Sequence, residues 1–252
     1  MTKKTKFYSF IIVALTFAIT FVMADLFSSI LTVGNFAFLP TQGIKSNKYT
    51  LYCLALYKTA TIGEANTQVQ EIKLRGGAGY VYSANGMYYI LASGYENKND
   101  ATKVQENLEV NQTTSEIIEM QIGEITVDMS LNGNEKTAMT NAINSFKTTY
   151  KNLYDISVSL DTGVKNLAES KLLITSELES LSAIKTSFDS SFVSKLTSEV
   201  FKIKLKLAEM VLLLQQLTEN GADQKVLYSS YVKETYLKCV VLNKDLSKEL
   251  TV

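Results

Sequence analysis

Short apolar runs between positions 49 and 122 predict four β-strands separated by two helices. The runs are rich in aromatic and branched residues, as strands commonly are, and they cover residues 49–57, 78–82, 87–95 and 117–122. After the first and third runs, apolar residues recur at helical spacing. The order is strand, helix, strand, strand, helix, strand, which indicates one structural unit used twice.

The turn between the second and third strands predicts how they pair. Asn85-Gly86 is a typical two-residue hairpin turn, so these strands should be antiparallel neighbours. Two such half-units can place four strands in one sheet and both helices on one face of it. The other face of the sheet is then expected to be open to a ligand.

The second half of the chain has a helical pattern. Residues 134–252 contain no proline and only two glycines, Gly163 and Gly221. Polar breaks at 161–163, 189–191 and 220–223 predict three or four helices that fold back as a hairpin or bundle, and a long rod is the alternative. The most regular apolar run has the spacing of a coiled-coil seam; it consists of Leu196, Val200, Ile203, Leu207, Met210, Leu214 and Leu217.

The N-terminus has the pattern of a membrane or export segment. Lys3, Lys4 and Lys6 precede an uncharged apolar run at residues 7–24, which as a helix would span roughly 27 Å. The lysines should stay in the cytoplasm, so the bulk of the chain should lie outside. This predicts a single-pass membrane anchor, and the alternative is a signal peptide cleaved at Ala24 with secretion of the rest.

Composition excludes several kinds of site. Lys plus Arg and Asp plus Glu both number 25, so no overall field favours nucleic acid. Histidine is absent, which excludes Ser-His-Asp and Cys-His catalysis and His-ligated zinc. We predict no metal, no cofactor and no enzyme activity; a carboxylate-based glycan hydrolase is the enzymatic alternative. Cys53 and Cys239 are expected to be buried and unpaired, or to form a long-range disulfide if both lie in an oxidising compartment.

Two parts of the chain share a pattern of strand, polar turn and alanine-led helix. One is Tyr89-Ile90-Leu91-Ala92-Ser93-Gly94-Tyr95 followed by Asp100-Ala101, and the other consists of the parallel elements Leu54-Ala55-Leu56-Tyr57 and Glu64-Ala65. This pattern resembles the SPOR domain. This is the sporulation-related repeat of bacterial cell-division and envelope proteins. The resemblance covers residues 49–122. It implies a small ferredoxin-like fold without catalytic residues, which binds septal peptidoglycan through glycan strands stripped of their stem peptides. The largely apolar first strand departs from the family pattern, in which that strand is more polar.

The expected fold class is therefore α+β. A ferredoxin-like βαββαβ domain of SPOR type, with a four-stranded antiparallel sheet, should be preceded by a transmembrane helix and followed by an all-α bundle or coiled coil. The expected parts are a basic cytoplasmic tail at 1–6, an anchor with its apolar extension at 7–39, a linker at 40–48, the SPOR-like domain at 49–129 and the helical region at 130–252.

Tyrosines on the expected open face are the candidate sugar contacts, since tyrosine offers both an apolar ring and a hydroxyl. Strand alternation puts residues two apart on the same face. The predicted ligand-binding residues are Tyr80, Tyr82, Tyr89, Leu91, Ser93 and Gln121.

The predicted partners are peptidoglycan glycan strands, bound by a membrane-anchored envelope protein acting in cell division or sporulation. The C-terminal helices permit a protein partner or a homodimer. The alternative is a coiled-coil envelope scaffold or partner-binding protein that binds no glycan.

Overall fold

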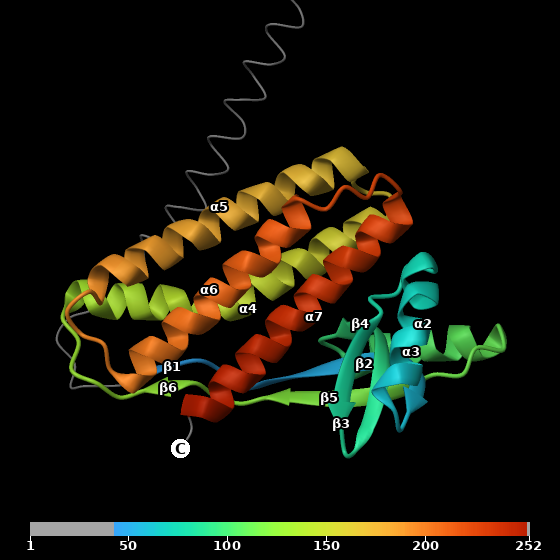
Figure 1. The fold of residues 1–252 in the computed structure, drawn as a ribbon, viewed down its shortest axis with the longest axis horizontal. Helices are drawn as coiled ribbons and strands as arrows, with labels where there is room; N and C mark the ends of the chain where they lie inside the picture. Colours follow the sequence, from blue (N-terminus) through green and yellow to red (C-terminus); the bar gives the residue numbers. More distant parts are fainter. Residues whose placement is uncertain (1–42, 251–252) are drawn as a thin grey trace, which may run out of the picture. The chain divides into compact units, whose positions relative to one another are not determined.

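Twelve elements make up residues 43–250, which the computed structural model describes (Figure 1). The strands are β1 Ile44–Lys45, β2 Tyr49–Thr59, β3 Tyr80–Ala84, β4 Met87–Tyr95, β5 Glu116–Ile122 and β6 Thr126–Val127. The helices are α2 Ile62–Leu74, α3 Lys98–Val110, α4 Gly133–Thr162, α5 Leu167–Ser191, α6 Ser198–Thr218 and α7 Lys225–Leu250. Within this part of the chain the class is α+β.

The four longer strands form one antiparallel sheet in the order β3-β4-β2-β5. The predicted hairpin joins β3 to β4, and both Asn85 and Gly86 have positive φ angles, 51° and 72°, as a type I′ turn requires. Strands β1 and β6, which were not predicted, pair with each other in a separate two-stranded sheet.

Local caps divide the second half of the chain into four helices. Asn132 caps α4 and Asn166 caps α5. Each asparagine side chain accepts a hydrogen bond from the backbone amide of a glutamate three residues later, Glu135 or Glu169, and the glutamate carboxylate accepts one from the asparagine backbone amide. Such a capping box satisfies amide groups that a helix N-terminus leaves free. Gly163, with a φ of 77°, ends α4. The helices fold back into a bundle, so the rod alternative is wrong for the described residues.

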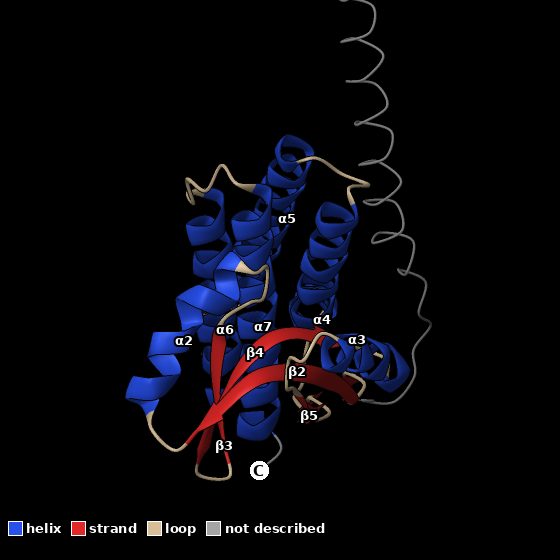
Figure 2. Cartoon of the chain, turned by 90° about the vertical axis from the view of Figure 1, so that its right-hand side faces the viewer, coloured by secondary structure: helices blue, strands red, loops and turns tan. Residues whose placement is uncertain are grey.

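Helices cover both faces of the four-stranded sheet (Figures 1 and 2). Ala65 and Ile72 of α2 pack with Ile90 of β4 on one face. On the other face, buried residues of β2, β4 and β5 join those of the α4–α7 bundle in one continuous hydrophobic core. Residues 49–129 and 130–252, which were expected as separate regions, therefore share a core.

The predicted transmembrane helix and single-pass membrane localisation need correction. Across residues 43–250, no helix combines the length and the apolar character that crossing a bilayer requires. The fold class is therefore corrected to α+β without a membrane-spanning helix among the described residues. The predictions for residues 1–6 and 7–39 and for cleavage at Ala24 concern positions outside the described residues.

Candidate functional site

The predicted strand alternation holds from Tyr80 to Tyr82 and from Tyr89 to Leu91, but the register between β2 and β4 shifts at Ala92, before Ser93. Tyr80 lies opposite Leu91 and Tyr82 lies opposite Tyr89 in the register of β3 and β4, so these four side chains share one face of the sheet. That face is not open, because Tyr89 is only 5% exposed and Leu91 is 0% exposed. Both belong to the core that the sheet shares with the bundle.

Helix α7 closes this face with polar as well as apolar contacts. The Tyr236 hydroxyl lies 2.9 Å from Ser93 Oγ and accepts a hydrogen bond from the Gly94 amide at 2.8 Å. Lys244 Nζ donates to the Tyr82 hydroxyl, and Leu237 is fully buried beside the sheet. The expectation of an open ligand face is therefore wrong.

Gln121 does not join the other five predicted ligand residues. In the register of β2 and β5, Leu51 pairs with Met120 and Thr50 pairs with Gln121. Leu51 and Met120 are buried in the shared core, so Gln121 projects from the opposite face, where it is exposed. The six residues predicted from the sequence thus do not form one surface.

Close packing of the sheet against α7 leads to a stability prediction at Gly94. A Cβ placed there would lie 2.5 Å from Leu51 Cδ2 and 3.2 Å from Leu237 Cδ2. We expect Gly94→Ala to lower the free energy of unfolding by about 2 kcal/mol, since overpacking displaces well-packed neighbours. Urea denaturation followed by circular dichroism measures this. Gly63→Ala is the matched control, because its Cβ meets nothing within 4 Å; equal destabilisation by both changes would contradict the packing described here.

An exposed apolar surface lies on α6, among residues 43–250. Phe201, Leu205 and Leu212 are 60%, 47% and 52% exposed, and Ala208 lies between them. Spacings of four, three and four residues align these side chains along one stripe of the helix, which we call the α6 stripe. The opposite side of α6 is buried in the bundle and consists of Val200, Ile203, Leu207, Met210, Val211, Leu214 and Leu217.

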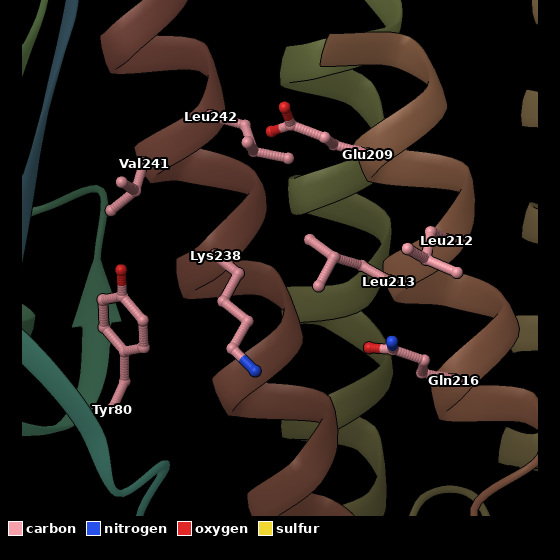
Figure 3. A pocket seen from close by; sticks show the side chains of 8 residues that line it. All are labelled: Tyr80, Glu209, Leu212, Leu213, Gln216, Lys238, Val241 and Leu242. Atoms are coloured by element: carbon pink, nitrogen blue, oxygen red, sulfur yellow. The ribbon is translucent and has the colours of Figure 1, made fainter. Parts of the chain in front are cut away.

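A groove adjoins the C-terminal part of the α6 stripe. It has a volume of about 290 Å³ and is lined by Tyr80, Glu209, Leu212, Leu213, Gln216, Lys238, Val241 and Leu242 (Figure 3). The lining side chains come from β3, α7 and α6, and most of them are apolar. Tyr80 is the predicted ligand residue that lines this opening, and burial raises the pKa of its hydroxyl to about 12.

Charged groups lie at the rim of the groove and are already paired. Lys206 Nζ lies 3.3 Å from a carboxylate oxygen of Glu209, and Lys238 Nζ lies 2.8 Å from Glu234. Across residues 43–250 no cluster of three His, Cys, Asp or Glu side chains is placed to hold a metal ion. The arrangement can bind an apolar group.

Comparison with known proteins adds little to this geometry. No protein-family model matches the chain, and no curated protein matches it either. Among solved structures, the peptidoglycan-binding domain of the B. subtilis cell wall lytic enzyme CwlC is similar at a TM-score of 0.24 and 13% identity. The likeness covers 34% of this chain and 99% of that domain. A likeness this weak supports no conclusion about fold or function.

Proposed function

We propose that this protein is a non-catalytic assembly protein that binds a protein partner through the α6 stripe and the adjoining groove. The observation that carries the proposal is the exposure of apolar side chains on the outer side of a helix whose inner side is also apolar. An amphipathic helix of a bundle normally has one apolar side, which faces the core, and presents polar residues to solvent. Here one side of α6 packs in the bundle, while Phe201, Leu205 and Leu212 face solvent.

Helix α6 is packed firmly enough to hold the α6 stripe as a rigid docking surface. Helix α6 packs on both α5 and α7, and its inner residues are fully or almost fully buried. Grouped apolar residues on a firm surface are typical of protein–protein contact sites. The sheet face that would otherwise compete for a ligand is occupied by α7.

Site-specific photo-crosslinking in living cells tests this proposal. A photoreactive amino acid at Phe201, Leu205 or Leu212 should form a covalent adduct with a protein. The same amino acid at Leu172 is the control, because Leu172 is 63% exposed but lies on α5. Absence of adducts at the stripe, or equal adducts at Leu172, would contradict the proposal.

A second candidate function is binding of a peptidoglycan glycan strand, of the septal, denuded kind that the SPOR resemblance implies. The observation that favours it is Tyr80, which still lines an open groove together with Gln216 and Lys238. An aromatic ring beside amide and ammonium groups suits a sugar ring and its hydroxyls. The aliphatic side chains Leu212, Leu213, Val241 and Leu242, which make up half of the lining residues, favour a protein segment instead.

Co-sedimentation with purified wall sacculi separates the two functions. If the groove binds glycan, Tyr80→Ala should lower retention several-fold, while Tyr57→Ala, at an exposed tyrosine of β2, should not. Unchanged retention of both variants would remove the groove as a glycan site. Release of soluble sugar from the sacculi during the same incubation would contradict the non-catalytic role.

A further inference from the structure

We infer that the partner on the α6 stripe is a second copy of this chain, whose α6 packs antiparallel to the first about a twofold axis. This inference rests on the proposed function for the location of the surface. It adds the identity of the partner and the pairing of residues across the contact.

The α6 stripe is complementary to itself when the two helices run in opposite directions. Pairing about the midpoint between Leu205 and Ala208 places Phe201 opposite Leu212 of the second copy, and Leu205 opposite Ala208. A twofold axis repeats each contact, as an isologous interface requires. Each larger side chain then faces a smaller one, and the four-three-four spacing is that of helices that interlock their side chains.

Charges beside the stripe also match across the twofold axis. At 100° per residue, Lys202 and Glu209 lie on the same flank of the stripe. In an antiparallel pair equal flanks meet, so Lys202 of each copy approaches Glu209 of the other. Both side chains are partly accessible. Their present contacts, Lys202 with the Glu249 carbonyl at 2.8 Å and Glu209 with Lys206 at 3.3 Å, leave carboxylate and ammonium positions for a further contact.

The other flank of the α6 stripe, which carries Lys204, gives evidence against a parallel pair. A parallel arrangement would need Lys204 to reach Glu209 of the second copy. Lys204 is instead held by Asp189 of its own chain, with Nζ 3.1 Å from Oδ1. Asp189 is also bound by Lys185 at 2.6 Å, so its carboxylate anchors both lysines to α5 and holds Lys204 within its own chain. Opposed helix dipoles add a small further preference for the antiparallel arrangement.

The groove gives the antiparallel pair a place for its largest side chain. Leu212 belongs both to the α6 stripe and to the groove lining, so Phe201 of the second copy, placed opposite Leu212, lies at the groove's mouth. The phenyl ring would contact Leu213 and Leu242, both of which line the groove. An aromatic anchor in an apolar pocket is the usual centre of a specific interface.

Cysteine cross-linking tests both the dimer and its direction. Chains carrying Phe201→Cys and chains carrying Leu212→Cys are mixed and oxidised, and the mixture should give a covalent dimer. Phe201→Cys alone should not, because in an antiparallel pair the two positions 201 lie about 16 Å apart along the helices. The native Cys53 and Cys239 are buried and unpaired, so they give a low background. Dimers of Phe201→Cys with itself, or no product from the mixture, would overturn the inference.

Sedimentation analysis of the full chain, and separately of the fragment 43–252, measures the dissociation constant of the dimer. Leu212→Ser and Phe201→Ser should each raise the dimer dissociation constant at least tenfold, and Leu172→Ser should leave it unchanged.

Lys202→Glu and Glu209→Lys should each weaken the dimer, and the two changes together should restore it. A wild-type fragment that stays monomeric, or a double exchange that fails to restore association, would overturn the inference.

The two proposals fail in different ways. If the purified chain is monomeric but photo-crosslinks at Phe201 to a different protein in cells, the dimer is wrong and the assembly function stands. If neither a dimer nor an adduct at the stripe forms, both are wrong.

Discussion

Replacing Tyr236 by alanine is expected to lower the free energy of unfolding by about 4 kcal/mol. Its side chain is fully buried between α7 and the sheet, and truncating a buried aromatic residue removes apolar contacts and leaves a cavity. Its hydroxyl also accepts a hydrogen bond from the Gly94 amide, which would lose its partner inside the core. Urea denaturation measured by far-UV and near-UV circular dichroism gives the change.

The same experiment shows whether the sheet and the bundle unfold together. Because one core joins them, the wild-type fragment should unfold in a single transition, and Tyr236→Ala should move that transition as a whole. Tyr236→Phe keeps the ring and should cost only about 2 kcal/mol, from the lost hydrogen bonds. Two separate transitions, with only one sensitive to Tyr236, would show that the sheet and the bundle are independent.

Stability is expected to fall steeply as the pH rises above 9. Burial raises the pKa of the Cys53 and Cys239 thiols from 9.0 to about 12, and burial also holds the pKa of the Tyr236 hydroxyl well above 10.0. Between pH 9 and pH 12 the unfolded chain releases thiol protons that the folded chain retains. The unfolded state then binds fewer protons, so the free energy of unfolding decreases with pH. The loss by pH 10.5 should be roughly 2 kcal/mol for each thiol.

Urea titrations at pH 7, 9 and 10.5 test the alkaline loss. The matched variant replaces both Cys53 and Cys239 by alanine, which removes the thiol protons. Its stability should be lower at pH 7, because contacts are lost, but should decline less between pH 9 and 10.5. If the decline is the same in both proteins, thiol ionisation is not its cause.

Residues with strong local signals allowed the sheet to be predicted from the sequence. Asn85-Gly86 adopts the positive φ angles of its turn type, and the alternation of Tyr89, Ile90 and Leu91 determines which side chain faces which layer. The helix break at Gly163 was one of two interpretations, beside an unbroken rod, and the structure selects it because a left-handed residue favours glycine. These features depend on neighbours in the chain, which is why a single sequence contains them.

The covering of the sheet by α7 could not be predicted in the same way. Tyr236 and Leu237 face the core, but Ser230 and Ser247 are buried as well. Ser230 Oγ donates to the Lys73 carbonyl, and Ser247 Oγ accepts from the Gly123 amide. Small polar residues on a helix are usually exposed, and these two are buried where α7 meets distant parts of the chain. A long-range contact of this kind leaves no periodic signal in the chain.

The exposure of the α6 stripe could not be predicted from the sequence either. The inner seam was predicted from Leu196 to Leu217, and its residues from Val200 to Leu217 are buried, whereas Leu196 precedes α6 and is 65% exposed. Phe201, Leu205 and Leu212 follow an equally regular spacing. Periodicity therefore shows that both sides of α6 are apolar, but the structure is needed to tell which side the chain itself covers.

The position of α7 in the chain has a consequence for how this protein is made. Helix α7 begins at Lys225, 103 residues after β5 ends at Ile122. The ribosome therefore releases the strands long before the helix that shields them. In the interval the nascent chain carries a bare layer that includes Leu91 and Met120, which makes it a substrate for chaperones and prone to aggregation. A stop codon before position 225 should yield an insoluble product and not a smaller working domain.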